Sequence, residues 1–363
     1  MGRPVLRYLA VPLARSQKSE PLNMKNKDIF EPFRGSSFGD LPWDRNREDK
    51  FESLLDETAS EWYEAKHGSP TVKEILLINA LEIPDCPWCG SSDFIRYGMT
   101  HSGIRRYLCR DCRRTFVPLT QTLFDSKRIP MSEWMEYLFH LMEFHSLVTS
   151  ARDNRNARST GKYWLLKLFD LLDGYQENIV VSGRVWIDET MFPVAESERT
   201  AVGGRRLRGI SRNLTAAGCA TDGIHTFLVS EGTSKPSMLS TWRAYGSRIL
   251  PGSTVFHDGE HSHGVLFRRI PGLKDVLFPS EETKGLKDSE NPLYPINHIH
   301  MLAKRFIGAH GGYGRPHLQD WLNLLAYILN PPFSRIMKVR NLLQMAVFRR
   351  RRMKYRDVMS KKR

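Results

Sequence analysis

The sequence predicts a multidomain α+β protein, and three observations support this prediction. Apolar residues recur at helical spacing before residue 178. Short β-rich runs bounded by Gly, Asp or Ser dominate from Val180 onward. Two CxxC pairs lie between two helical segments, in a stretch dense in Gly, Arg and aromatic residues. We therefore expect, in order, a helical lead-in, a cysteine-held module, a second helical region, an α/β domain and a basic C-terminal helix.

Size and charge limit the classes of protein to which this chain can belong. Its 363 residues are 40% hydrophobic, which suffices for two or three domains with apolar cores. Lys and Arg number 54 against 40 for Asp and Glu, which indicates a polyanionic partner such as nucleic acid or an anionic membrane surface. The tail 331–363 holds most of this excess. We expect it to bind DNA phosphates without sequence preference, and the alternative is a solvated helix that keeps the protein soluble.

The start of the chain carries no convincing targeting signal. No run of eighteen apolar residues occurs, and Pro4 and Pro12 interrupt the first apolar stretch. We therefore expect a cytoplasmic protein. Residues 1–43 are expected to form a disordered leader, and Met24 is a plausible alternative translation start. A helical lead-in is expected over residues 44–83, with helices over 44–67 and 71–81.

Four of the five cysteines form two CxxC pairs separated by nineteen residues. They are Cys86, Cys89, Cys109 and Cys112. In a cytoplasmic chain this spacing predicts a closed, structural four-thiolate Zn²⁺ site, not disulfides, in a zinc ribbon over residues 84–120. The fifth, Cys219, lies in a predicted strand and is expected to be a small buried apolar residue.

Arginines crowd the predicted ribbon beside Tyr107 and Phe116. They are Arg105, Arg106, Arg110, Arg113 and Arg114. Guanidinium groups mixed with aromatic rings suit phosphate contact and base stacking, so we expect this module to bind DNA or RNA. The alternative is a solvated basic face on a module that zinc only holds together.

A helix-turn-helix-like region is expected over residues 121–178. Residues 147–172 fit a helix, a short turn and a second helix that Ser159 or Thr160 caps. Arg158 and Lys162 lie near the start of that second helix, where a recognition helix contacts DNA. The alternative is an ordinary packed hairpin, because the same helix carries Trp164, Leu165, Leu168 and Phe169.

The β-rich domain, expected over residues 180–330, carries two carboxylates at similar positions. Strands are expected at 184–187, 215–220, 226–230 and 253–256, and a helix at 316–330 closes the domain. Asp188 and Asp258 each follow an apolar strand. Carboxylates at the ends of neighbouring strands can converge on a hard divalent cation such as Mg²⁺. Taken alone, either aspartate could instead cap the turn that follows its strand.

Asn297 and Lys304 lie seven positions apart, which places them on one face of a helix. An amide oxygen can bind Mg²⁺, but it carries no charge and cannot act as a base. On local sequence alone, the favoured interpretation is that Asn297 caps the helix that it begins.

These motifs together resemble bacterial insertion-sequence transposases of the ISXO2-like group. The resemblance runs from about residue 86 to 330 and rests on the order and spacing of short motifs: CPWCGS, YLCRDCRRTF, TLFDSKRIPMSEW, VWIDET, RGIS, TVFHDG, NHIHMLAK and GAHGGYGRPHLQDWL. It implies an RNase H-like catalytic core with a sheet flanked by helices, and Asp188 on its first strand. It also implies Asp188, Asp258 and Asn297 as ligands of catalytic Mg²⁺ or Mn²⁺, with Lys304 gripping a DNA strand end.

The chemistry that the resemblance implies is cleavage of an element's own ends and their transfer to target DNA. Two metal ions roughly 3.5–4 Å apart would activate a water or 3′-hydroxyl and stabilise the leaving oxygen, so no side chain has to act as a base. The implied partner is double-stranded DNA, both the terminal inverted repeats and the target. Because two ends must be held together, we expect a homodimer or larger assembly on DNA, and no membrane partner.

Two alternatives of other classes stay open. One is a DNA-binding protein without catalysis, either a decayed transposase copy or a regulator. The other is an RNase H-like nuclease or resolvase that cuts but does not join. Within the site, Glu281, Glu282 or Glu290 could supply a third carboxylate in place of Asn297, although 281–285 reads as an exposed polar loop.

Overall fold

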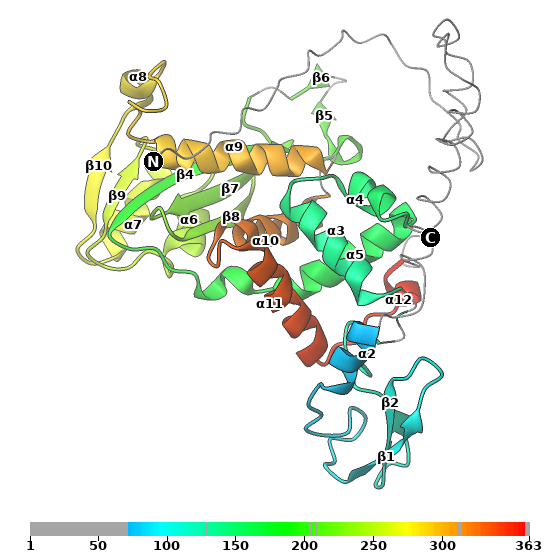
Figure 1. The fold of residues 1–363 in the computed structure, drawn as a ribbon. Coiled ribbons are helices and arrows are strands. Elements are labelled where there is room, and N and C mark those ends of the chain that lie inside the picture. Colours follow the sequence, from blue (N-terminus) through cyan, green and yellow to red (C-terminus); the bar gives the residue numbers. More distant parts are fainter. Residues whose placement is uncertain are drawn as a thin grey trace, which may run out of the picture. The chain divides into compact units, whose positions relative to one another are not determined.

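The computed structural model describes residues 72–359, apart from 126, 128, 203, 204, 208 and 311–313 (Figure 1). The leader expected over 1–43 and the helix expected over 44–67 lie outside the described residues. The second helix of the lead-in is present as α2 (Val72–Asn79). Among the described residues, no helix is long and apolar enough to cross a membrane.

A small three-stranded antiparallel sheet follows α2. Its strands, in the order β1-β2-β3, are β1 (Phe94–Met99), β2 (Arg105–Cys109) and β3 (Thr115–Phe116). The rings of Phe94, Tyr107 and Phe116 pack together with centroids 5.4 to 5.6 Å apart. Together with the buried Cys86 and Cys109 they form the core of this module, which is too small to be stable by apolar burial alone.

Three helices follow: α3 (Met131–Met142), α4 (Leu147–Asp153) and α5 (Arg158–Leu172). The side chain of Ser146 caps α4 by accepting a hydrogen bond from the backbone N–H of Thr149 at 3.0 Å. The four apolar residues predicted to pack from α5 are buried. The helical hairpin is therefore a packed unit, whatever its exposed face contacts.

The predicted cap of α5 is wrong. The helix begins at Arg158 with Ala157 as its N-cap, so Ser159 and Thr160 lie inside its first turn. The turn closes earlier because the Asn156 side-chain amide donates to a carboxylate oxygen of Glu133 at 2.9 Å. This contact between elements is not visible in local sequence.

The domain that follows is built on a mixed five-stranded sheet with the order β10-β9-β4-β7-β8. The strands are β4 (Arg184–Pro193), β7 (Leu214–Thr221), β8 (Thr226–Thr233), β9 (Thr254–His257) and β10 (Lys274–Leu277). Strands β4, β7 and β8 pair antiparallel, whereas β9 pairs parallel with both β4 and β10. The sequence did not predict β10, since this short edge strand is largely exposed and carries charged residues.

Helices cover both faces of this sheet (Figure 1). The β7 and β8 residues Ala217, Cys219 and Leu228 join a core with α9 (Tyr294–Ala309), α10 (Leu318–Leu329) and the helical region. Their neighbours Ala220 and Phe227 face the other way, into a core with α6 (Met238–Tyr245) and α7 (Gly264–Arg269). Side chains alternate between the two faces of a strand. Adjacent residues of β4 therefore also point toward opposite faces of the sheet. Cys219 is buried, as its sequence context predicts.

Short elements connect these units. They are the 3₁₀ turns Tyr175–Asn178, Glu196–Glu198, His261–His263 and Arg315–His317, the two-residue strands β5 (Ala201–Val202) and β6 (Arg205–Arg206), and the one-turn helices α8 (Ser280–Thr283) and α12 (Tyr355–Met359). The predicted closing helix begins two residues late, because residues 315–317 form a 3₁₀ turn before α10.

The basic tail packs against the rest of the chain. Its main helix, α11 (Arg335–Phe348), buries Val339, Leu342 and Ala346 in the core shared with α3 and α5. The arginines that follow meet acidic partners: Arg351 lies 2.7 Å from Asp170, Arg352 lies 2.8 Å from Asp125, and Arg350 forms an ion pair with Asp85. The alternative of a solvated helix is therefore wrong for α11, because one face of the helix is apolar.

Candidate active site

Asp188 and Asp258 are brought side by side by the pairing of β4 with β9. Trp186 pairs with Phe256 in parallel register, so the residues two places further along each chain fall next to each other. Asp258 leaves the sheet at the end of β9, as predicted. Asp188 does not end a strand, since β4 continues to Pro193 and Asp188 pairs with Cys219 of β7. That prediction was wrong because the alternating pattern continues through Thr190 and Phe192.

The site has an excess of negative charge. Burial, together with the charges of Asp258 and Glu189, raises the pKa of Asp188 to about 7. The Asp188 side chain is still 22% exposed, so a ligand can reach it. A buried carboxylate with a raised pKa beside a second carboxylate provides a suitable place for a divalent cation, which would stabilise the charged form of Asp188.

Helix α9 crosses the same face of the sheet and carries Asn297. The helix begins at Tyr294, and the backbone N–H of Asn297 already donates to the Leu293 carbonyl at 3.1 Å. Asn297 is therefore inside the helix, and the interpretation of this residue as a cap is wrong. Its side chain is exposed and borders a surface hollow of about 580 Å³.

Four further residues of α9 line that hollow, and two of them, His300 and Lys304, have side chains that bear on the site. The Nδ1 atom of His300 lies 3.7 Å from Oδ2 of Asp188, which ties this hollow to the carboxylates. Burial and the nearby charge of Lys304 lower the pKa of His300 to about 4, so this ring is neutral at neutral pH. Lys304 is exposed and can meet an anion that approaches the sheet.

The three alternative carboxylates do not join this group. Glu281, Glu282 and Glu290 are all exposed. Residues 280–283 form the one-turn helix α8, where an irregular loop was expected. Among the described residues, none of the three has a hydrogen bond or ion pair with Asp188 or Asp258.

A buried polar chain lies on the opposite face of the sheet, and sequence analysis missed it. The His257 Nε2–H donates to Asp275 at 2.9 Å, and its Nδ1 accepts from the Gly259 backbone N–H at 3.2 Å. His263 lies between His257 and Glu189. Its Nδ1 atom is 3.1 Å from Nδ1 of His257, and its Nε2–H donates to the Glu189 carboxylate at 2.9 Å. The only signal in the sequence was the position of Glu189 next to Asp188 and of His257 next to Asp258.

The charge state of this chain follows from its contacts. Burial lowers the pKa of His263, but the hydrogen bond and charge of Glu189 outweigh it, and the net pKa is raised. Burial and the charge of Glu189 raise the pKa of Glu231 to about 8. Glu189 and His263 therefore form a buried ion pair, and Glu231 beside them is neutral. This pair holds the main chain of β4 directly beside Asp188.

The four paired cysteines converge as predicted. The Sγ atoms of Cys86 and Cys112 lie 3.7 Å apart, and those of Cys89 and Cys109 lie 3.6 Å apart. Tetrahedral zinc with Zn–S bonds of about 2.3 Å requires sulfur atoms roughly 3.8 Å apart. This four-cysteine cluster is therefore compatible with zinc.

The arginines of the ribbon differ in their surroundings. Arg110, Arg113 and Arg114 are exposed, and Arg105 and Arg106 are half-buried. The guanidinium of Arg106 lies over Tyr97, and that of Arg114 lies over Trp88. Arg110 lies 3.6 Å from Asp93. Phe116 is only 4% exposed, so the expectation that it offers a stacking surface is wrong, because its ring fills the core of the module.

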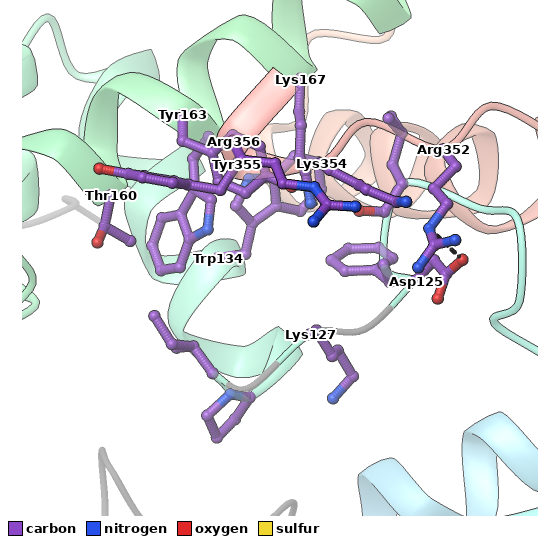
Figure 2. Close-up of a pocket in the computed structure, with 15 residues that line it drawn as sticks. Asp125, Lys127, Trp134, Thr160, Tyr163, Lys167, Arg352, Lys354, Tyr355 and Arg356 are labelled. Carbon is purple, nitrogen blue, oxygen red and sulfur yellow. Dashed lines mark hydrogen bonds and ion pairs between the residues drawn. The ribbon is translucent and has the colours of Figure 1, made fainter. Parts of the chain in front are cut away.

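The start of α5 borders a pocket of about 660 Å³ (Figure 2). Arg158 is exposed at the first position of the helix, and Lys162 is half-buried one turn later. The pocket lies between α3, α5 and the C-terminal segment, and Figure 2 shows Tyr163, Lys167 and Tyr355 on its walls. Lys167 donates to the Leu123 carbonyl, so this cation is already satisfied within the chain.

Comparison with known proteins gives one distant relative. No protein-family model matches the chain. A protein described as an uncharacterized protein in transposable element ISH50, from Halobacterium salinarum, is 26% identical over 255 residues, which is 65% of this chain and 82% of that protein. This chain is thus a distant homologue of a protein from a transposable element.

Solved structures of the Mos1 transposase give weak overlays. The pre-cleavage Mos1 transpososome is 10% identical, covers 57% of this chain and 75% of its own, and has a TM-score of 0.24. The Mos1 strand transfer complex is 11% identical, covers 58% and 74%, and has the same TM-score. A TM-score of 0.24 is too low to indicate a shared fold.

Proposed function

We propose that this protein is a DNA transposase that cuts and joins the ends of its own insertion sequence in a metal-dependent reaction. The observation that carries the proposal is the meeting of β4, β9 and α9 on one face of the sheet, with Asp188 beside Asp258 and His300 of α9 within 3.7 Å of Asp188. The distant homology to a protein of a transposable element supports the biological setting. Strand β4, the first strand of this sheet in chain order, carries Asp188, as the resemblance to an RNase H-like core implies.

The residues of the site divide the work by their chemistry. Asp188 and Asp258 offer charged oxygens and Asn297 a neutral one, which is the ligand type that Mg²⁺ or Mn²⁺ takes. Bound there, such ions supply Lewis-acid activation of a water or 3′-hydroxyl and of the leaving oxygen. Lys304 is exposed on the same helix, where its ammonium would bind a phosphate of the DNA strand end. Neutral His300 leaves Asp188 free of a competing positive charge.

The remaining modules would hold the DNA. Exposed arginines of the zinc ribbon and Arg158 at the start of α5 offer phosphate contacts, and Lys162 lies on the same helix. We propose the division of the chain into a ribbon (84–120), a helical DNA-binding region (121–178) and a catalytic core (180–330). Two such chains would hold the two ends of one element.

A strand-transfer assay tests this function. The reaction combines zinc-loaded protein, a labelled duplex carrying the element's end, a supercoiled plasmid, and Mg²⁺ or Mn²⁺. The wild type should give joined product, and Asp188→Ala, Asp258→Ala and Asn297→Ala should each lose at least about a hundredfold in rate, as expected for loss of metal ligands. The matched control is the triple variant Glu281→Gln, Glu282→Gln, Glu290→Gln, which should retain activity.

The other outcomes identify the alternatives. Cut but unjoined product would indicate a nuclease. Binding without cutting, across metals and verified ends, would indicate a DNA-binding protein without catalysis. Loss of activity in the triple variant with retention in Asn297→Ala would move the third ligand to the loop and contradict the assignment of Asn297.

A further inference from the structure

The turn between α3 and α4 brings two histidines together. Helix α3 ends in a Schellman turn, in which the Phe144 N–H donates to the Leu141 carbonyl at 3.1 Å and the His145 N–H donates to the His140 carbonyl at 3.0 Å. Phe144 adopts the left-handed φ of 64° that this turn requires, and its ring packs against Phe306 of α9 with centroids 5.0 Å apart. The rings of His140 and His145 consequently stack, with centroids 5.2 Å apart.

The last residue of α4, Asp153, faces both rings. Its Oδ2 atom lies 4.0 Å from Nδ1 of His140 and 3.9 Å from Nδ1 of His145. These separations are too long for hydrogen bonds. Both Nδ1 atoms are shielded from solvent and have no hydrogen-bond partner. Such shielded nitrogen atoms without a partner cost free energy, which an ion that contacts both of them would recover.

We propose that His140, His145 and Asp153 bind a transition-metal ion, with Zn²⁺ as the expected occupant. Two imidazole nitrogens and a carboxylate oxygen are a ligand set that zinc accepts, and the three ligand atoms lie within 4.8 Å of one another. Tetrahedral zinc needs such atoms roughly 3.4 Å apart. Rotation of these partly exposed side chains can close the difference, and water can take the fourth position.

A neighbouring carboxylate fits this arrangement. Glu143 lies 3.9 Å from Nε2 of His145. When Nδ1 binds the metal, Nε2 carries the proton, and carboxylates commonly orient metal-bound histidines in this way. The ion would join the C-terminal ends of α3 and α4 and fix the turn from which α5 starts. Any effect on DNA affinity rests on the proposed function, whereas metal binding does not.

The test is the zinc content of the full-length protein, measured by mass spectrometry after dialysis against zinc buffered in the micromolar range. The wild type should hold two zinc ions per chain. The variants Asp153→Asn and His140→Gln/His145→Gln should each hold one, with circular dichroism confirming their fold. The matched control is His225→Gln, since His225 lies 3.7 Å from Asp222 in an ordinary His–Asp pair without a second histidine. That variant should keep both ions.

Cobalt substitution separates this site from the four-cysteine cluster. The thiolate site gives an intense sulfur-to-cobalt charge-transfer band, whereas a nitrogen and oxygen site adds only weak visible bands. The double histidine variant should lose the weak bands and keep the intense one. One zinc per chain in the wild type, or two in both the double variant and Asp153→Asn, would overturn the proposal. Neither readout depends on transposition.

Discussion

At the residue scale, the proposed metal-binding role of Asp188 opposes the stability of the fold. Its pKa is raised to about 7 by burial and by two neighbouring carboxylates, whereas an unfolded Asp titrates near 4. Below about pH 4 the group is protonated in both states and has no effect. Between about pH 4 and 7 the unfolded chain releases the proton first, so the metal-free native state loses stability as pH rises through this window.

Replacement of Asp188 by Asn should therefore stabilise the metal-free protein. At pH 8, in buffer without magnesium or manganese, we expect the free energy of unfolding of Asp188→Asn to exceed that of the wild type by on the order of 2 kcal/mol. The difference should vanish near pH 4, which is the internal control. Urea unfolding at several pH values measures it. Equal stabilities at pH 8 would show that the site is not electrostatically strained.

The buried ion pair of Glu189 and His263, on the other face of the sheet, should stabilise the fold, so its loss should lower the free energy of unfolding. His263→Ala leaves the Glu189 carboxylate buried without its partner, and we expect a loss of about 3–5 kcal/mol in urea unfolding at neutral pH. His225→Ala removes an exposed histidine from a His–Asp pair that is 3.7 Å apart, and should cost less than about 1 kcal/mol. A small loss in His263→Ala would show that Glu189 is neutral or finds another donor.

The two faces of β4 also show what the sequence could predict. Asp188, Asp258 and the cysteines stand in short local motifs, and local pattern sufficed to select them. Glu189 and His263 are 74 positions apart, and no period or spacing links them. Their relation depends on how the 3₁₀ turn His261–His263 and the following α7 pack against the sheet, which only tertiary structure provides.

At the element scale, packing between helices overrides local signals. α5 begins before its expected caps, and the tail is a packed helix whose arginines meet internal acids. Gly161 shows why α4 and α5 can approach closely, since a Cβ at this position would lie 2.9 Å from Cβ of Ala151. A glycine within a predicted helix is visible in the sequence, but its contact with Ala151 of the neighbouring helix is not.

Gly161→Ala should therefore destabilise the helical region, although alanine favours helices. We expect overpacking of about 1–3 kcal/mol to exceed the helix-propensity gain of about 1 kcal/mol. At Gly308 of α9, an added Cβ would meet no atom within 4 Å, and Gly308→Ala should be neutral or stabilising. Thermal unfolding of the two variants compares them. A stabilised Gly161→Ala would contradict the close packing of α4 on α5.

At the scale of the whole molecule, the net charge of +14 divides between free and internally paired cations. Arg351 and Arg352 are paired with acids of the helical region, whereas Arg113 is exposed on the ribbon. Only cations that release counterions on binding contribute to the salt dependence of DNA affinity. The molecule should therefore use fewer phosphate contacts than its composition indicates.

Salt titration of DNA binding can separate these groups. Arg113→Gln should reduce the slope of log affinity against log salt by about 1, uniformly across DNA sequences. Arg351→Gln should leave the slope unchanged, because its charge is already offset by Asp170. An equal fall in slope for both variants would place the tail at the DNA surface.

The central claim is that strands β4 and β9 and helix α9 form one metal site. Iron-mediated cleavage of the polypeptide tests it most directly: Fe²⁺ should occupy the proposed magnesium site, where ascorbate with peroxide then cuts the backbone near the ion. We predict cuts near Asp188, Asp258 and Asn297 that excess Mg²⁺ suppresses and Asp188→Ala abolishes. Cleavage near Glu281 and Glu290 without cleavage near Asn297, or no Mg²⁺-sensitive cleavage in β4, would contradict it.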